Sequence, residues 1–348
     1  MKYPSKRIYI YPITRRGTDD SRNPYISNLT SALQKNFHII NKDSPSNSGI
    51  AQCFMFFHKV DIFVFNWIEN LPDRKAGKLQ VFMLLVLFFL GKLFNKKIIW
   101  IMHNKLSHSK TNIKIKRKVF INLLQYSDLI LTHSSEGIKF ARDLYPGMKA
   151  SRIKFLHHPV SGQITLDTNR VKTPKKFDVM IWGTMAPYKG VDNFLKFLKD
   201  KGISNKFYIH IIGKFSSMKY FNKVRNLVSS TITIENRFAG EGELVELTSN
   251  SSHVLFPYDD SSILSSGALM DTLTFTTNII GPNSGAFADL ASEGLIQVFN
   301  TYEDIVKILE QPTSEHDIQH KHQAMKHFNS KNNWDTFADK MTDLIQHM

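Results

Sequence analysis

The sequence of 348 residues contains one cysteine, Cys53, and no long uninterrupted apolar run. One cysteine cannot form an internal disulfide or a cysteine-based zinc site, which excludes a small disulfide-stapled module and favours a reducing compartment. The most apolar stretch is residues 81–90 (VFMLLVLFFL). Since a bilayer span requires about 20 apolar residues, we expect this stretch to form a buried or interfacial helix instead of a membrane crossing.

Acidic residues are scarce in the first half of the chain. Residues 1–170 contain 27 lysines and arginines against 10 aspartates and glutamates, whereas residues 171–348 contain 18 against 20. A cationic excess confined to one half indicates a partner that carries phosphates, either a nucleic acid or an anionic lipid surface. The apolar content of 42% is ordinary for a folded protein, and a chain of this length usually exceeds one hydrophobic core.

Short β-rich runs alternate with helical stretches along the whole chain, which is typical of parallel sheets covered by helices on both faces. Strands are expected at residues 8–13, 62–65, 98–102, 129–132 and 153–156, and in a second series at 179–182, 208–212, 232–235, 254–256 and 278–280. The pattern predicts an α/β fold of two Rossmann-like, doubly wound domains that face a central cleft. The expected parts are a first domain (1–163), a linker (164–176), a second domain (177–330) and a C-terminal helix (331–348) that caps the second domain or crosses back to the first.

Two loops of the second domain suit a phosphate-bearing ligand. Residues 183–190 (GTMAPYKG) follow its first strand, where Gly183 allows close backbone approach and Lys189 precedes a helix whose N-terminus favours an anion. Further on, Ser265 and Ser266 open a second helix whose free N–H groups can hold a diphosphate. The alternatives are a plain βα loop with a solvated lysine and an ordinary helix cap.

Asp271 lies about one turn into that second helix, where a carboxylate could accept hydrogen bonds from a ribose diol. Taken together, the two loops and Asp271 resemble the donor site of a GT-B glycosyltransferase of the retaining family 4 (group 1) type. The segment GTMAPYKG is similar to the glycine–lysine donor loop of that family, and residues 254–282 are similar to its donor-binding helix and flanking strands. The chain departs from the family at three positions, since Asp271 and Ile263 replace two glutamates and Thr184 replaces an arginine.

The resemblance implies roles for particular residues. The donor-binding residues would be Gly183, Lys189, Arg237, Tyr258, Ser265, Ser266, Gly267, Ala268 and Asp271. His103, at the end of an expected strand, would be the catalytic histidine beside the transferred sugar, although a structural histidine is the alternative. The acceptor would contact Asn23, Tyr25, Trp67, Asn104 and His108.

A membrane surface is the partner that the basic, apolar segment of the first domain suggests. The residues expected to contact it are Met83, Leu84, Phe88, Phe89, Lys92, Lys96, Lys97, Lys116 and Arg117. No metal or other cofactor is expected, because the sequence has no Asp-x-Asp triplet and the histidine pair at 157–158 lacks the spacing of a metal site. The donor would be a UDP- or GDP-sugar.

The sequence therefore predicts a glycosyltransferase that moves a sugar from a nucleotide sugar to a lipid-linked saccharide in bacterial surface polysaccharide biosynthesis. We expect a cytoplasmic protein attached peripherally to the inner face of the cell membrane. One alternative is a sugar-nucleotide 2-epimerase of the same fold, which would act on the donor alone. Another is a non-catalytic basic binding module, but no zinc-finger or aromatic RNA-binding motif indicates a nucleic-acid partner.

Overall fold

The computed structural model describes residues 6–13, 24–105, 111–162, 175–259, 263–312 and 314–348. These residues divide into two compact units. Unit 1 comprises the described residues within 1–159, 263–265 and 334–348, and unit 2 comprises those within 160–259 and 266–333. Most of the predicted linker, residues 163–174, lies outside the described residues.

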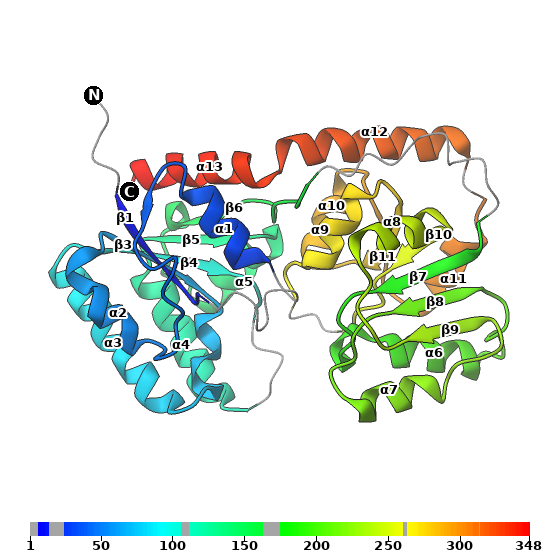
Figure 1. The fold of residues 1–348 in the computed structure, drawn as a ribbon, viewed down its shortest axis with the longest axis horizontal. Helices are drawn as coiled ribbons and strands as arrows, with labels where there is room; N and C mark the ends of the chain where they lie inside the picture. Colours follow the sequence, from blue (N-terminus) through cyan, green and yellow to red (C-terminus); the bar gives the residue numbers. More distant parts are fainter. Residues whose placement is uncertain (1–5, 14–23, 106–110, 163–174, 260–262, 313) are drawn as a thin grey trace. The chain divides into compact units, whose positions relative to one another are not determined.

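Unit 1 contains a sheet of six parallel strands in the order β2-β1-β3-β4-β5-β6 (Figure 1). The strands are β1 (Arg7–Tyr11), β2 (His38–Ile39), β3 (Ile62–Asn66), β4 (Lys97–Met102), β5 (Leu129–Thr132) and β6 (Ile153–Phe155). The helices are α1 (Tyr25–Leu33), α2 (Ala51–Phe56), α3 (Gly77–Leu93), α4 (Ile113–Tyr126), α5 (Ser135–Leu144) and the C-terminal α13 (Trp334–Gln346).

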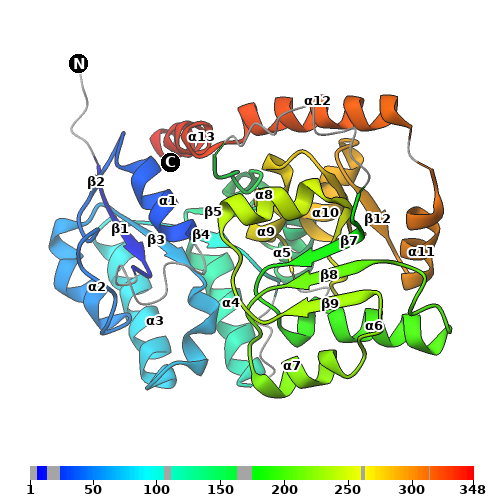
Figure 2. The ribbon, with the colours of Figure 1, turned by 45° about the vertical axis from the view of Figure 1, so that its right-hand side comes forward.

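Alternate residues of the unit 1 strands enter two separate cores, because successive side chains of a strand point to opposite faces of the sheet. Tyr9, Phe63 and Trp100 pack with residues of α2, α3 and α4 on one face. Their neighbours Ile8, Ile62 and Ile99 pack with residues of α1 and α13 on the other. The two sets of helices lie on opposite sides of the sheet in Figure 2, and the C-terminal helix thus completes the core of unit 1.

Unit 2 contains a second sheet of six parallel strands, in the order β12-β11-β10-β7-β8-β9. The strands are β7 (Phe177–Trp182), β8 (Ile209–Ile212), β9 (Ile232–Glu235), β10 (Ser251–Leu255), β11 (Asn278–Pro282) and β12 (Gln297–Phe299). The helices are α6 (Val191–Asp200), α7 (Met218–Arg225), α8 (Glu241–Ser249), α9 (Gly267–Thr274), α10 (Gly285–Ser292), α11 (Tyr302–Glu310) and α12 (Glu315–Lys331). The strand order reverses between β10 and β7, which is where open α/β sheets bind ligands.

The predicted α/β class with two Rossmann-like, doubly wound sheets is confirmed. Strands β5 and β9 have the predicted bounds, and the other predicted strands are shifted by one to three residues at their ends. Strands β2 and β12, which have two and three residues and lie at the edges of the sheets, were not predicted from the sequence.

Three residues predicted to contact a membrane are buried, so that prediction is wrong for them. Leu84 and Phe88 lie on the inner face of α3 and belong to the core of unit 1. The stem of Lys116 is buried as well, and its ammonium group pairs with Asp73. Among the helices of the described residues, none is long and apolar enough to cross a membrane.

Candidate functional site

The loop after β7 is shaped by two glycines with positive φ angles. Gly183 has φ of +105° and Gly190 has φ of +66°, a region that side chains with a Cβ rarely adopt. A Cβ on Gly190 would also lie 2.0 Å from the carbonyl oxygen of Pro257, in the loop after β10. The β7 and β10 loops therefore meet at the point where the strand order reverses.

Lys189 ends a short 3-10 helix, Pro187–Lys189, within this loop. Its side chain is only 7% exposed, and its Nζ lies 5.0 Å from the ring centroid of Tyr258. Burial opposes the charge of Lys189, but the neighbouring phenols of Tyr258 and Tyr188 outweigh it and raise the pKa above its ordinary value. Within the part of the chain that the structure describes, no carboxylate pairs with this ammonium group.

The first turn of α9 adjoins Lys189. A Cβ placed on Gly183 would lie 3.6 Å from both the Nζ of Lys189 and the Cβ of Ala268, which brings these three residues together. Ser266 is the N-cap of α9 but makes no side-chain cap bond, and its Oγ lies 3.2 Å from the hydroxyl of Tyr258. The N–H groups that open α9 thus receive no cap bond from the Ser266 side chain, and the first turn of the helix lies close to the ammonium group of Lys189.

Asp271 follows one turn later on α9. Burial, with a smaller contribution from the charge of Glu241, raises the pKa of its carboxyl to about 7. Near neutral pH the carboxyl is therefore partly protonated, and the protonated form can donate a hydrogen bond. A bound diol that donates to the carboxyl would favour the ionised form.

Arg237, which follows β9, is engaged elsewhere. Its guanidinium pairs with Glu235 at 2.7 Å and with Glu243 at 2.5 Å. The two carboxylates already compensate its charge, so Arg237 is less suited than Lys189 to an incoming anion. Sequence reasoning could not foresee this, because the pairing depends on how the β9 strand end meets α8.

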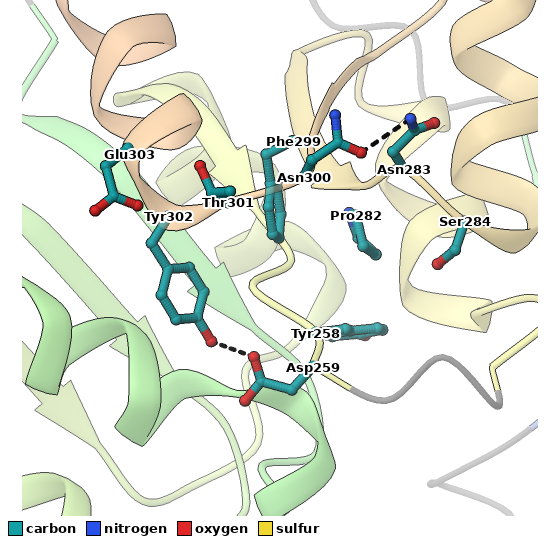
Figure 3. A pocket seen from close by; sticks show the side chains of 10 residues that line it. All are labelled: Tyr258, Asp259, Pro282, Asn283, Ser284, Phe299, Asn300, Thr301, Tyr302 and Glu303. Carbon is teal, nitrogen blue, oxygen red and sulfur yellow. Dashed lines mark hydrogen bonds between the residues drawn. The ribbon is translucent and has the colours of Figure 1, made fainter.

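A cavity of about 480 Å³ lies at the carboxyl ends of β10, β11 and β12 (Figure 3). Its lining combines aromatic, hydroxyl and amide groups from Tyr258, Asp259, Pro282, Asn283, Ser284, Phe299, Asn300, Thr301, Tyr302 and Glu303. In Figure 3 the hydroxyl of Tyr302 donates to Asp259, and Asn283 donates to Asn300 at 3.1 Å. Of these lining residues only Tyr258 was predicted as a site residue, because the cavity depends on β12, which is too short to be predicted from the sequence.

In unit 1, an aromatic cluster surrounds Tyr25 at the carboxyl ends of the strands. The ring of Tyr25 lies 4.7 Å from that of His103 and 5.8 Å from that of Trp67, and its hydroxyl bonds to His133 Nε2 at 2.8 Å. Tyr25 is buried, and its burial argues against the prediction that its side chain contacts an acceptor. Trp67 has φ of +47°, a rare conformation for a residue with a side chain. Its ring stacks on that of His103, with the ring centroids 4.2 Å apart.

The hydrogen bonds around His103 determine which of its ring nitrogens carries the proton. Asn66 donates through Nδ2 to the carbonyl of Tyr11 at 3.3 Å, which orients its Oδ1 toward His103. The Nε2 of His103 lies 3.0 Å from that Oδ1 and must donate to it. The Nδ1 of His103 therefore keeps its lone pair and is able to accept a hydrogen bond.

His103 and two further histidines are uncharged at neutral pH. Burial, reinforced by His133 and His158, lowers the pKa of His103 well below its ordinary value. Burial likewise lowers the pKa of His133 to about 3 and that of His158 to about 4. His133 was missed as a cluster residue, although it follows directly on β5 just as His103 follows on β4.

The remaining predicted acceptor residues are placed as follows. Asn104 forms an isolated antiparallel bridge with Ile263. Asn23 and His108 lie outside the described residues.

Solved structures resemble this chain over nearly its whole length. Anabaena HepE, in complex with UDP and glucose, has a TM-score of 0.66 at 10% identity, with 99% of this chain and all of HepE covered. The lipopolysaccharide outer core galactosyltransferase WaaB has a TM-score of 0.61 at 13% identity, with 99% of both chains covered. TarM has a TM-score of 0.58 at 11% identity over 85% of this chain and 58% of its own.

No protein-family model matches the sequence, and no curated protein matches it either. At identities of 10–13%, the structural likeness establishes the fold, which is the GT-B type with two Rossmann-like domains.

Proposed function

We propose that the protein is a glycosyltransferase that takes its sugar from a nucleotide-sugar donor held by unit 2. The observation that carries this proposal is the buried ammonium group of Lys189, which has two phenols but no carboxylate beside it among the described residues. A buried ammonium group that keeps its charge, and that no carboxylate of these residues pairs with, is suited to an anion brought by a ligand. HepE, which shares the fold, has been solved with UDP and with UDP-glucose.

In this proposal the diphosphate of the donor lies between Lys189 and the first turn of α9. Cleavage of the bond between sugar and phosphate transfers negative charge to the diphosphate. A preorganised cation and the N-terminus of α9 would stabilise that charge in the transition state. Asp271 would accept hydrogen bonds from the ribose diol, and no metal ion would be required at the diphosphate.

His103 would face the transferred sugar as a neutral imidazole. With Nε2–H donated to Asn66, the free Nδ1 can accept a hydrogen bond from a sugar hydroxyl but cannot provide a proton. Its role would be to position the sugar, and the acid chemistry of a protonated histidine is not part of the mechanism.

The acceptor, in this proposal, is a lipid-linked saccharide used in surface polysaccharide biosynthesis. The support is electrostatic, since the first half of the chain is strongly cationic and such acceptors present phosphates at a membrane surface. Retention of the anomeric configuration is proposed from the similarity of the donor loop to that of family 4. A location at the cytoplasmic face of the membrane follows from the same assignment.

A thermal-shift screen against UDP, GDP, CMP and their sugars tests the donor site. A nucleotide present at about 100 times its Kd should stabilise the protein by about 2.7 kcal/mol. Lys189→Met is expected to abolish this stabilisation because the methionine fills the space without a charge.

Lys199→Met provides the matched control, because Lys199 is an exposed lysine of α6 in the same unit. It should leave the nucleotide stabilisation unchanged. A full nucleotide shift in Lys189→Met would contradict the diphosphate assignment. Incubation of the donor alone, followed by NMR of the sugar, separates the transferase from an epimerase, since only an epimerase would invert a sugar hydroxyl without an acceptor.

A further inference from the structure

Helix α3 of unit 1 carries apolar residues on its outer face as well as on the face that packs against the core. Leu79, Phe82, Phe89 and Leu93 follow one another at helical spacing along the outer face, and each is more than half exposed, from 58% for Leu79 to 67% for Phe89. Leu85 and the adjoining Phe94 extend this face. A surface helix of a water-soluble domain normally carries polar residues there, so a contiguous apolar face of this kind marks an interaction surface.

The inner face of α3 holds the helix in place. Leu84, Leu87 and Phe88 are almost completely buried and pack against the strands of unit 1. Phe88 also stacks on Tyr126 of α4, with ring centroids 5.7 Å apart. Because the inner face packs in the core, a partner can contact only the outer face of α3. The helix axis would then lie along the surface of that partner.

Cations surround the outer face of α3, and anions are absent from its part of the sequence. Residues 74–127 contain twelve lysines and arginines and no aspartate or glutamate. Lys78 and Lys92 lie on α3 itself, and Lys114, Arg117 and Lys118 are exposed on α4, which packs beside α3 in Figures 1 and 2. An apolar strip within a cationic rim complements a surface that offers hydrocarbon behind anionic groups.

We propose that the outer face of α3, with the cations of α4, is the surface by which unit 1 binds an anionic lipid bilayer. The phenylalanines and leucines enter the boundary between headgroups and acyl chains, and the lysines contact lipid phosphates. A second copy of the chain is a poorer occupant, because two faces with the same cationic rim repel each other. This surface deepens the membrane location of the proposed function by naming the residues that make the contact, and it does not depend on the nucleotide assignment.

Flotation of the full-length protein with vesicles tests the surface. The protein should float with vesicles of phosphatidylcholine and phosphatidylglycerol at low salt, bind less at high salt, and bind weakly to phosphatidylcholine alone. Phe82→Ser combined with Phe89→Ser should lower the partition coefficient roughly 100-fold, equivalent to about 1.4 kcal/mol for each phenylalanine. The matched control is Tyr208→Ser with Met218→Ser, two exposed apolar residues of unit 2.

A second pair of variants tests the cations. Lys114→Gln with Lys118→Gln should lower binding roughly 30-fold at low salt, equivalent to about 1 kcal/mol for each charge. Lys199→Gln with Lys219→Gln removes two exposed lysines from unit 2 and should have little effect. All four pairs replace exposed side chains, and near-identical Tm values would confirm that each variant is folded.

Three results would overturn the proposal. The first is failure of the native protein to float with anionic vesicles at low salt. The second is equal loss of binding in the variants of unit 1 and the controls of unit 2. The third is a concentration-dependent dimer that Phe82→Ser with Phe89→Ser dissociates, which would identify a second copy as the occupant. Nucleotide binding by the same samples, measured by thermal shift, would report separately on the donor site.

Discussion

Buried polar side chains of unit 1 differ in how completely their hydrogen bonds are satisfied. His103 bonds to Asn66, while Asn66 and His133 bond to backbone carbonyls, and these bonds fix the orientation of the three side chains. Glu69 is the contrasting case, because it is 2% exposed and neither carboxylate oxygen has a hydrogen-bond partner among the described residues. Burial raises the pKa of Glu69 to about 7, although the nearby Trp100 and Lys116 favour its ionised form in part.

Glu69→Gln should remove a pH dependence from the stability of the protein. From pH 4.5 to about 7 the folded protein keeps a proton on Glu69 that the unfolded chain has lost, so the free energy of unfolding falls as pH rises through this window. Glutamine is uncharged throughout. The stability of Glu69→Gln relative to the native protein should therefore increase from pH 4.5 to 7 and level off above, as measured by urea denaturation at each pH.

The exposed Glu246→Gln of α8 is the control for the loss of one negative charge. A difference between Glu69→Gln and the native protein that stays constant from pH 5 to pH 8 would show that Glu69 is already ionised in the folded state.

At the level of elements, the central strands were predictable and the faces of α3 were not. Strands such as β5 are continuous apolar runs, because parallel strands are buried on both faces. The edge strands β2 and β12 are too short to produce such a run. Helix α3 has no polar face from which its orientation could be read, so Leu84 and Phe88 were assigned to a membrane when the sheet in fact buries them.

The site residues that belong to a local sequence pattern were predictable, and those that depend on tertiary packing were not. Gly183, Lys189 and Ala268 lie in loops that follow strands or open helices, and the structure brings them together. The pairing of Arg237 with Glu243 and the contact of Tyr25 with His133 depend on tertiary packing, which leaves no local pattern.

Truncation of two adjacent phenylalanines of α3 should change stability by very different amounts. Phe88→Ala removes a fully buried ring and should lower the free energy of unfolding by about 3–5 kcal/mol. Phe89→Ala removes a ring that is 67% exposed and should change it by less than about 0.5 kcal/mol. Urea denaturation of both variants provides the measurement. Similar losses in the two would mean that the helix is rotated about its axis relative to the structure described here.

At the scale of the whole molecule, the excess positive charge and the proposed donor site belong to different halves of the sequence. Residues 1–170 carry a net charge of +17 and residues 171–348, which include the proposed donor site, a net charge of −2. A uniformly basic protein would attract nucleotides and lipids through the same side chains. Here the two kinds of phosphate are expected to meet different residues, Lys189 in unit 2 and the lysines beside α3 in unit 1.

Hydrogen exchange can map this division in one protein sample. UDP should slow exchange in residues 183–190 and 266–271, where the β7 loop and α9 would enclose the diphosphate, while residues 77–94 and 113–118 remain unchanged. Vesicles containing phosphatidylglycerol should slow hydrogen exchange in residues 77–94 and 113–118 and leave exchange in the donor loops unchanged. Protection of the same peptides by both ligands would mean that phosphate binds by general electrostatic attraction, and the separate roles of the two units would have to be abandoned.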